Sequence, residues 1–219
     1  MSKIPLKIKI FFAVAVVLFT WFWFSLPSKL FDAATSFVIE DKDGNLLNAS
    51  IASDGQWRFP YDENVPVKFI KCITTFEDKR FYTHPGVDPL ALSRAIIQNI
   101  KTKDVVSGGS TLTMQVIRLS RGTKRRNIFN KINESILAVR LECTNHKKTI
   151  LALYASNAPF GSNVVGLDAA SWRYFGRSAD ELSWGETTAL AVLPNAPSLV
   201  HPGKNQQELL RKRNFLLDK

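Results

Sequence analysis

A carboxylate pair directly after an apolar stretch is the first feature that could carry chemistry. Glu77 and Asp78 follow Phe76 and lead into the turn-forming sequence His84-Pro85-Gly86. At such a junction a glutamate can project into a cleft, and partial burial there raises the pKa of a carboxyl, as a general base requires. Acidic pairs also occur at ordinary solvated helix ends, so the residues alone leave both interpretations open.

A glycine pair, Gly108-Gly109, opens the second segment, and hydroxylated residues follow it. Free backbone N–H groups and the positive end of a helix make such a terminus an anion site. Thr111, Gln115 and Arg118 stand at i, i+4 and i+7, so we expect them on one polar helix face, apart from an apolar face that packs. A plain Gly-Gly loop before a capped amphipathic helix fits the same residues.

The third segment places Lys131 and Glu134 on one helix face. Taken alone, this is an exposed ion pair that contributes about 0.2–0.5 kcal/mol. The expected buried stripe of this helix consists of Ile128, Ile132, Ile136 and Val139. Basic residues cluster across the preceding loop, namely Arg118, Arg121, Lys124, Arg125, Arg126 and Lys131. A pyrophosphate or an anionic membrane surface suits that cluster, and plain solvation suits it too.

Other polar residues fit structural roles better. Ser183 and Glu186 have the spacing of a capping box, so we expect Glu186 to cap a helix. Cys72 and Cys143 lie in apolar helical patterns and are expected to be buried. No metal site is predicted from the histidines, because metal-ligand spacing is absent among His84, His146 and His201.

Helices must position most of these residues. Apolar residues recur at helical spacing from about residue 66, and further helices are expected at 88–101, 110–121, 127–145, 147–156, 166–175 and 183–193. In the first of these, Asp88 is expected to cap the helix and Pro89 to stand in its first turn. Residues 36–61 indicate short strands around the turn signals Asp43-Gly44 and Asp54-Gly55. The sequence therefore predicts a mainly α domain after a short β linker.

The uncharged stretch at residues 10–28 is long enough to span a membrane, which takes about 17 to 25 residues. Lys3, Lys7 and Lys9 precede it, which predicts a cytoplasmic N-terminus. A cleaved signal peptide is the rival interpretation, but residues 28–34 match its A-x-A-like cleavage site poorly. We therefore expect a cytoplasmic tail at 1–9, an uncleaved transmembrane anchor at 10–28, a β linker at 29–61 and an external domain at 62–219.

Composition limits the choice of partner. The 219 residues carry a net charge of +10, and their hydrophobic content of 45% excludes wholesale disorder. The basic balance indicates an anionic partner. A domain outside the cytoplasmic membrane does not meet nucleic acid, which leaves a lipid surface or a phosphorylated substrate.

Taken together and in this order, the segments resemble glycosyltransferase family 51, the transglycosylase domain of class A penicillin-binding proteins and of monofunctional transglycosylases. The resemblance extends from about residue 60 to the C-terminus and includes Gly-Gly-Ser-Thr-Leu-Thr-Met-Gln-Val and Asn-Ala-Pro-Phe-Gly. It implies a lysozyme-like α fold with a head and a membrane-apposed jaw. It also implies a peptidoglycan glycosyltransferase of the bacterial inner membrane, which polymerises lipid II into β-1,4-linked glycan with inversion and releases undecaprenyl pyrophosphate.

The same resemblance assigns roles to residues. Glu77 matches the general base that takes the 4-hydroxyl proton of the acceptor sugar, and Glu134 matches a second catalytic carboxylate. Substrate binding is implied for Asp78, Phe81, His84, Ser110, Thr111, Gln115, Arg118 and Lys131. A divalent cation, Mg²⁺ or Mn²⁺, is expected with the pyrophosphate, and no organic cofactor. The expected partners are lipid II, the growing lipid-linked glycan, the membrane and other cell-wall synthesis proteins.

Some positions depart from the pattern of the family. Asn130 stands where many relatives have arginine, Arg118 where many have lysine, and Ser156 where others have the asparagine of Tyr-Leu-Asn. Our hypothesis is that Arg126 compensates for Asn130 in binding the pyrophosphate. A module that binds lipid II without turnover is one alternative function, and a lysozyme-like glycan hydrolase is another. No Ser-x-x-Lys motif occurs, so we expect no transpeptidase domain in this chain.

Overall fold

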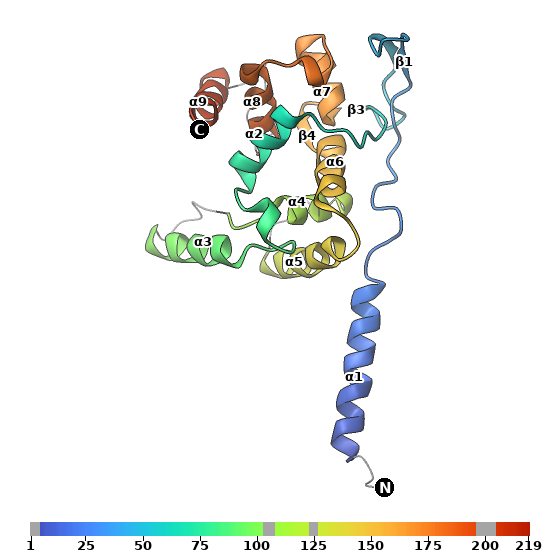
Figure 1. Cartoon of the computed structure of the whole chain (residues 1–219), viewed down its shortest axis with the longest axis vertical. Helices are drawn as coiled ribbons and strands as arrows, with labels where there is room; N and C mark the ends of the chain where they lie inside the picture. The colour runs from blue at the N-terminus through green and yellow to red at the C-terminus, as the bar shows by residue number, and fades with distance from the viewer. Residues whose placement is uncertain (1–4, 103–107, 123–126, 196–204) are drawn as a thin grey trace.

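The computed structural model describes residues 5–102, 108–122, 127–195 and 205–219 (Figure 1). Helices dominate the described residues and the strands are short, which confirms the predicted mainly α class. The predicted positions Lys3, Ser107, Arg126 and His201 lie outside these ranges.

The N-terminal helix α1, Leu6–Trp23, stands away from the rest of the chain (Figure 1). Its 18 residues are apolar on all sides and none is buried, so by length and composition it suits a membrane span. The helix begins four residues before the predicted anchor, because Lys7 and Lys9 extend its first turns. Arg140 of the domain binds the C-terminal end of α1, where its Nε donates to the carbonyl of Trp23 at 2.8 Å.

The segment after α1 forms a hairpin from β1, Val38–Glu40, and β2, Leu46–Ala49, around the predicted Asp43-Gly44 turn. A third strand differs from the expectation of a separate linker. β3, Trp57–Arg58, pairs in parallel with β5, Val164–Val165, which also pairs antiparallel with β4, Pro159–Gly161. A two-residue strand cannot persist alone, so β3 takes its partner from the domain.

The helices of the domain confirm the predicted elements and add one. Their bounds are α2 Val67–Glu77, α3 Pro89–Thr102, α4 Leu112–Ser120, α5 Ile128–Glu142, α6 Lys147–Asn157, α7 Leu167–Phe175, α8 Trp184–Val192 and α9 Gln206–Leu217. Short 3₁₀ turns lie at Phe81–Thr83, Ala179–Glu181 and Leu193–Asn195. The helix α9 was not predicted, because it buries only Leu216 and is otherwise rich in charge.

Helix caps hold several of these elements where the sequence indicated. Asp88 accepts from the backbone N–H of Ala91 at 2.9 Å and caps α3. Ser183 and Glu186 form the predicted capping box of α8. The predicted structural role of Glu186 is therefore confirmed.

The helix α4 is buried on both faces, which corrects the expected division into a packed and a polar side. Apolar Leu112 and Val116 are buried, and so are the polar side chains Thr113 and Gln115. The reason is that α4 lies between α5 and α6, so its polar groups find partners inside the protein. Thr113, for example, donates to Glu142 of α5 at 2.7 Å.

The expected apolar stripe of α5 is wrong. Ile128 and Ile132 are 80% and 56% exposed, whereas Leu137, Ala138 and Leu141 form the buried face against α4. Both sets recur at helical spacing, and only the packing partner selects between them. Cys143 is also exposed, directly after α5, whereas Cys72 is buried as expected and its burial raises the pKa of the thiol to about 11.

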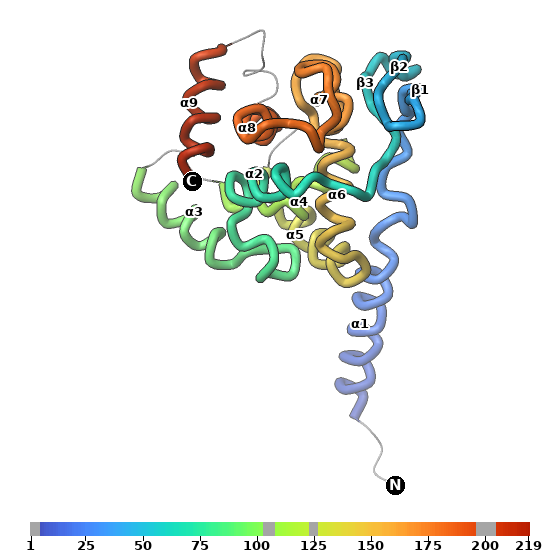
Figure 2. Tube along the Cα trace, turned by 45° about the horizontal axis from the view of Figure 1, so that its top comes forward, coloured from blue at the N-terminus to red at the C-terminus, as the bar shows by residue number. Residues whose placement is uncertain are grey.

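Exposed apolar side chains gather on α3 and α5. α3 and α5 lie at the end of the domain from which α1 extends (Figures 1 and 2). Their exposed apolar residues are Leu90, Ile96, Ile97, Ile100, Ile128, Phe129 and Ile132. The end of the domain from which the candidate membrane-spanning helix α1 extends therefore presents an apolar surface.

Candidate active site

Glu77 is the last residue of α2, and two amide side chains hold its carboxylate. Gln115 of α4 donates from Nε2 to Oε2 at 2.8 Å, and Asn195 donates from Nδ2 to Oε1 at 3.2 Å. Glu77 itself is only partly buried. Two donors stabilise the ionised carboxylate, which is the form that accepts a proton.

Beside Glu77, three residues of the first motif are buried. Asp78 and His84 are each 6% exposed, and Phe81 is fully buried. Nε2 of His84 lies 3.0 Å from Oδ1 of Asp78, whose Oδ2 accepts from the backbone N–H of Leu112 at 3.0 Å. These contacts tie the end of α2 to the start of α4, so Asp78, Phe81 and His84 support the site from inside the protein.

A cavity of about 460 Å³ opens in front of Glu77. It lies between the end of α2, the start of α3 and the segment before α4. Basic side chains line it together with acidic and small residues: Phe76, Glu77, Asp78, Lys79, Arg80, Asp88, Ala91, Arg94, Gly108, Gly109, Ser110 and Thr111. Three basic and three acidic side chains therefore line the cleft, and Glu77 is one of the three acidic ones.

Close backbone contacts explain two glycines around this cleft. A Cβ on Gly109 would lie 2.8 Å from Cα of Leu92, so the segment before α4 touches α3 directly. Gly86 has φ of +92°, and a Cβ there would lie 2.6 Å from the carbonyl oxygen of Ala138 in α5. The hydroxyl of Thr111 donates to the carbonyl of Gly86 at 2.5 Å and caps α4, so it has an internal role at the cleft wall.

The arrangement brings most of the predicted residues together. Glu77, Ser110 and Thr111 line the cleft, and Gln115 contacts Glu77 directly. Glu134 is buried on the face of α5 that packs against α4, and Lys131 is partly buried on the same helix. Arg126 is outside the described residues. Their roles toward substrate stay predictions.

Sequence reasoning missed two residues of the site. One is Tyr154, which belongs to the hydrophobic core and whose buried hydroxyl lies close enough to Glu77 and Arg118 for their charges to act on it. Burial raises the pKa of Tyr154 well above its usual value, Glu77 raises it further and Arg118 opposes the rise. The other is Asn195, which was missed because it ends a short 3₁₀ turn after α8, where an amide gives no signal.

Ser156, which stands where other members of the family have asparagine, is not part of the cleft at Glu77. Ser156 lines a different cavity, against Leu30, Phe31 and Tyr61 of the segment that follows α1. The change at this position therefore faces the linker and not the cleft of Glu77.

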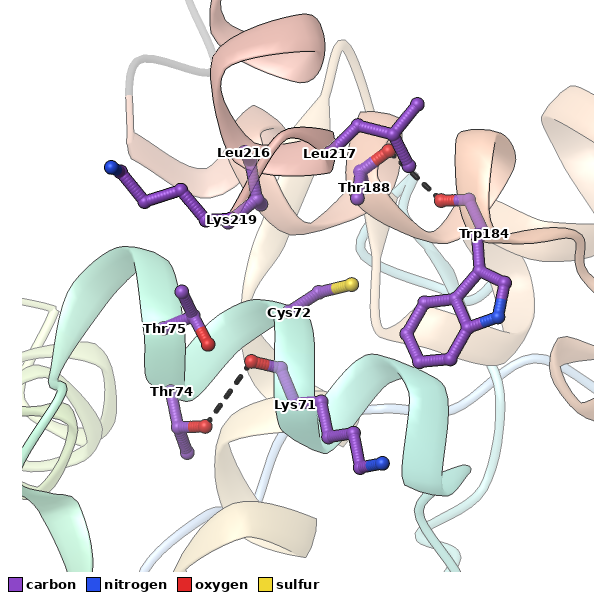
Figure 3. A pocket seen from close by; sticks show the side chains of 9 residues that line it. All are labelled: Lys71, Cys72, Thr74, Thr75, Trp184, Thr188, Leu216, Leu217 and Lys219. Atoms are coloured by element: carbon purple, nitrogen blue, oxygen red, sulfur yellow. Dashed lines mark hydrogen bonds between the residues drawn. The ribbon is translucent and has the colours of Figure 1, made fainter.

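The largest of these cavities, about 590 Å³, lies on another side of α2, between α2, α8 and α9 (Figure 3). It is lined by Lys71, Cys72, Thr74, Thr75, Trp184, Thr188, Leu216, Leu217 and Lys219. The hydroxyls of Thr74 and Thr188 donate to backbone carbonyls, and no carboxylate side chain occurs in this described lining. Its size therefore does not make it the candidate active site.

Among the residues that the structure describes, no group of three His, Cys, Asp or Glu side chains could hold a metal ion. The described His, Cys, Asp and Glu side chains therefore do not form a cation site by themselves.

The domain is mainly helical, carries a hydrogen-bonded carboxylate at the wall of a cleft, and follows a helix long and apolar enough to cross a membrane. Residues 43–219 match the Transglycosylase family, so the chain belongs to that family. It is similar to penicillin-binding protein 1C of Escherichia coli (strain K12), with 38% identity over 194 residues, which cover 88% of this chain and 25% of that protein.

Other relatives match over the same region. Penicillin-binding protein 1A of Aquifex aeolicus is 37% identical over 155 residues, which cover 71% of this chain and 21% of that protein. The crystal structure of penicillin-binding protein 1A from Haemophilus influenzae aligns with a TM-score of 0.43 and 21% identity, over 86% of this chain and 18% of that chain. The chain thus spans about a quarter or less of the length of these relatives.

Proposed function

We propose that this chain is a peptidoglycan glycosyltransferase that polymerises lipid II into β-1,4-linked glycan and releases undecaprenyl pyrophosphate. The observation that carries the proposal is the carboxylate of Glu77, held by Gln115 and Asn195 at the wall of a cleft that Lys79 and Arg94 also line. Membership of the transglycosylase family supports it.

In this mechanism Glu77 takes the proton of the 4-hydroxyl of the acceptor sugar. The hydroxyl oxygen then attacks the anomeric carbon of the lipid-linked donor from the side opposite to the pyrophosphate. The bond from this carbon to the pyrophosphate oxygen breaks, and the electron pair leaves with the pyrophosphate. A single displacement of this kind turns an α-linked donor into a β linkage.

The basic side chains of the cleft are suited to the leaving group. Lys79 and Arg94 line the cavity, and Arg80 lies there too, bound to Asp88 through Nε at 2.9 Å. Charge that develops on a leaving pyrophosphate is stabilised by cations already in place. A divalent cation, Mg²⁺ or Mn²⁺, bound together with the diphosphate would add to this stabilisation.

The position of the apolar surface supports a substrate in a membrane. α1 extends from the end of the domain where α3 and α5 expose their apolar residues (Figure 1). In our proposal α1 crosses the cytoplasmic membrane once with its N-terminus inside. The domain then lies on the outer face of the membrane, where a lipid-linked substrate can enter the cleft while its lipid chain stays in the bilayer.

Product analysis tests the proposal. The detergent-solubilised chain is incubated with labelled lipid II, and the products are separated by size and examined by NMR for their linkage. The expected product is long glycan with β-1,4 linkages. Bound lipid II without polymer would support the binding module, and shortening of added glycan would support the hydrolase; either result would overturn the proposal.

A further inference from the structure

The amide of Asn195 joins Glu77 to the C-terminal helix. Asn195 ends the 3₁₀ turn Leu193–Asn195, directly after α8. Its Nδ2 donates to Oε1 of Glu77 at 3.2 Å, and its Oδ1 accepts from Nζ of Lys212 in α9 at 3.2 Å. A side chain that was not part of any predicted motif thus connects the candidate base to α9.

Lys212 determines which end of this amide faces the base. An asparagine side chain has one end that donates and one end that accepts. Since the ammonium of Lys212 can only donate, it requires the oxygen of Asn195, and the N–H₂ group is left for the carboxylate. The reverse orientation would place two acceptor oxygens together at Glu77 and two donors together at Lys212.

The helix α9 is held firmly enough to fix this geometry. Leu216 is 5% exposed and packs into the core, and α9 lies against α8 and α2 (Figure 2). The side chain of Lys212 is 21% exposed, and its Nζ lies 4.0 Å from Oε1 of Glu208 on the same helix. Lys212 is therefore placed by its own helix and by partial burial.

We propose that Asn195 is a positioning residue for Glu77 and that Lys212, acting through Asn195, makes α9 part of the catalytic apparatus. This inference rests on the proposed function, in which Glu77 is the base. Gln115 holds one carboxylate oxygen and Asn195 holds the other, so the acceptor hydroxyl meets a carboxylate of fixed orientation.

A double-mutant cycle on polymerisation tests the relay. Asn195→Ala removes one hydrogen bond to a charged group and should lower kcat about tenfold with KM nearly unchanged. Lys212→Met should lower kcat by a smaller factor, about threefold, because the amide remains but loses its orientation. In the Asn195→Ala background, Lys212→Met should then have no further effect. Lys212→Arg, which keeps a donor, should restore most of the activity.

Two further measurements separate positioning from a merely structural role. Loss of a donor disfavours the ionised carboxylate, so the acid limb of the pH–rate profile should move to higher pH in Asn195→Ala and in Lys212→Met. Lys219→Met, two residues after the end of α9 and at the cavity of Figure 3, is the matched control and should leave the profile unchanged.

The carboxyl ¹³C signal of Glu77, identified by its loss in Glu77→Gln, gives a readout without turnover. It should move in Lys212→Met although Lys212 does not touch Glu77, and it should not move in Lys219→Met. The proposed relay from Lys212 through Asn195 to Glu77 would be overturned by additive effects of Asn195→Ala and Lys212→Met on kcat. It would also be overturned by a Glu77 carboxyl signal that Lys212→Met leaves unchanged. A parent chain that makes no polymer while its carboxyl signal responds to Lys212 would overturn the proposed function alone.

Discussion

Gln115 donates from Nε2 to Oε2 of Glu77 over 2.8 Å and so joins the middle of α4 to the end of α2. The two residues are 38 positions apart in the sequence and belong to separate segments that were each singled out for their chemistry. Because Gln115 is buried and Glu77 is only partly buried, the amide holds the carboxylate from the protein side and leaves the cleft side open.

Replacement of Gln115 should therefore reduce polymerisation strongly. Gln115→Glu places a second carboxylate against Glu77, and like charges at this distance disfavour ionisation of both. We expect the initial rate with labelled lipid II to fall about 10- to 100-fold. Gln98→Glu, an exposed site on α3, is the matched control. A Gln115→Glu rate equal to that of the parent would contradict the proposed contact.

Replacement of Asp78 should lower the stability of the fold, because its carboxylate has a structural role. Asp78→Ala leaves the backbone N–H of Leu112 and Nε2 of His84 without their buried acceptor. We expect a loss of about 2–4 kcal/mol in the free energy of unfolding, measured by denaturant or thermal unfolding. If the variant is as stable as the parent but no longer binds lipid II, the residue contacts substrate and the structural interpretation is wrong.

Asp168, in the first turn of α7, should make stability depend on pH. Burial, followed by the negative charges of Asp62, Asp180 and Glu40, raises its pKa from 3.8 to about 6. The folded state then holds a proton that the unfolded state releases, so this contribution is complete below pH of about 4 and is lost as pH rises through about 6.

Asp168→Asn should remove the cost of the buried charge. At pH 7.5 the variant should be more stable than the parent by about 1–2 kcal/mol, less than the full shift gives because the side chain keeps some contact with water. Below pH of about 4 the two should unfold alike. The measurement is thermal unfolding across this pH range, with Asp218→Asn at the exposed end of α9 as control. A variant less stable at pH 7.5 would refute the account of this carboxyl.

The apolar surface of α5 should matter only when the substrate is in a membrane. Phe129→Glu combined with Ile132→Glu places charges where we propose that the domain meets lipid. We expect polymerisation of lipid II in vesicles to fall about tenfold, with little change for a short-chain, water-soluble lipid II analogue. Phe215→Glu, on exposed α9 away from α1, should change neither (Figure 1). Equal losses on both substrates would indicate a folding defect and not lost membrane contact.

Local signals in the sequence predicted much of this fold. The cap at Asp88, the capping box of Ser183 and Glu186 and the Asp43-Gly44 turn all depend on neighbours in the chain, and all are found. The candidate site was located in part for the same reason. Glu77 and the Gly108-Gly109 segment mark a helix end and a helix start, which meet in one cleft.

Features that depend on distant partners were not predictable from one sequence. Ile128 and Ile132 have the spacing of a core stripe, yet α4 packs on another face of α5 and leaves them exposed. Asn195 gains its position from Lys212 and Glu77, which approach it only in the folded chain. Helix α9 shows too few apolar residues for its period to stand out, and its seat on α8 decides its conformation.

The most direct test of the central claim compares Glu77→Gln with the parent chain in polymerisation of labelled lipid II. Glutamine keeps the shape of the side chain but cannot accept the proton of the acceptor hydroxyl. Thermal unfolding and binding of lipid II are measured on the same samples to show that the variant is folded and binds its substrate. The account predicts long glycan from the parent and at least a 100-fold lower rate from the variant. A folded, substrate-bound Glu77→Gln that polymerises at the parental rate would contradict it.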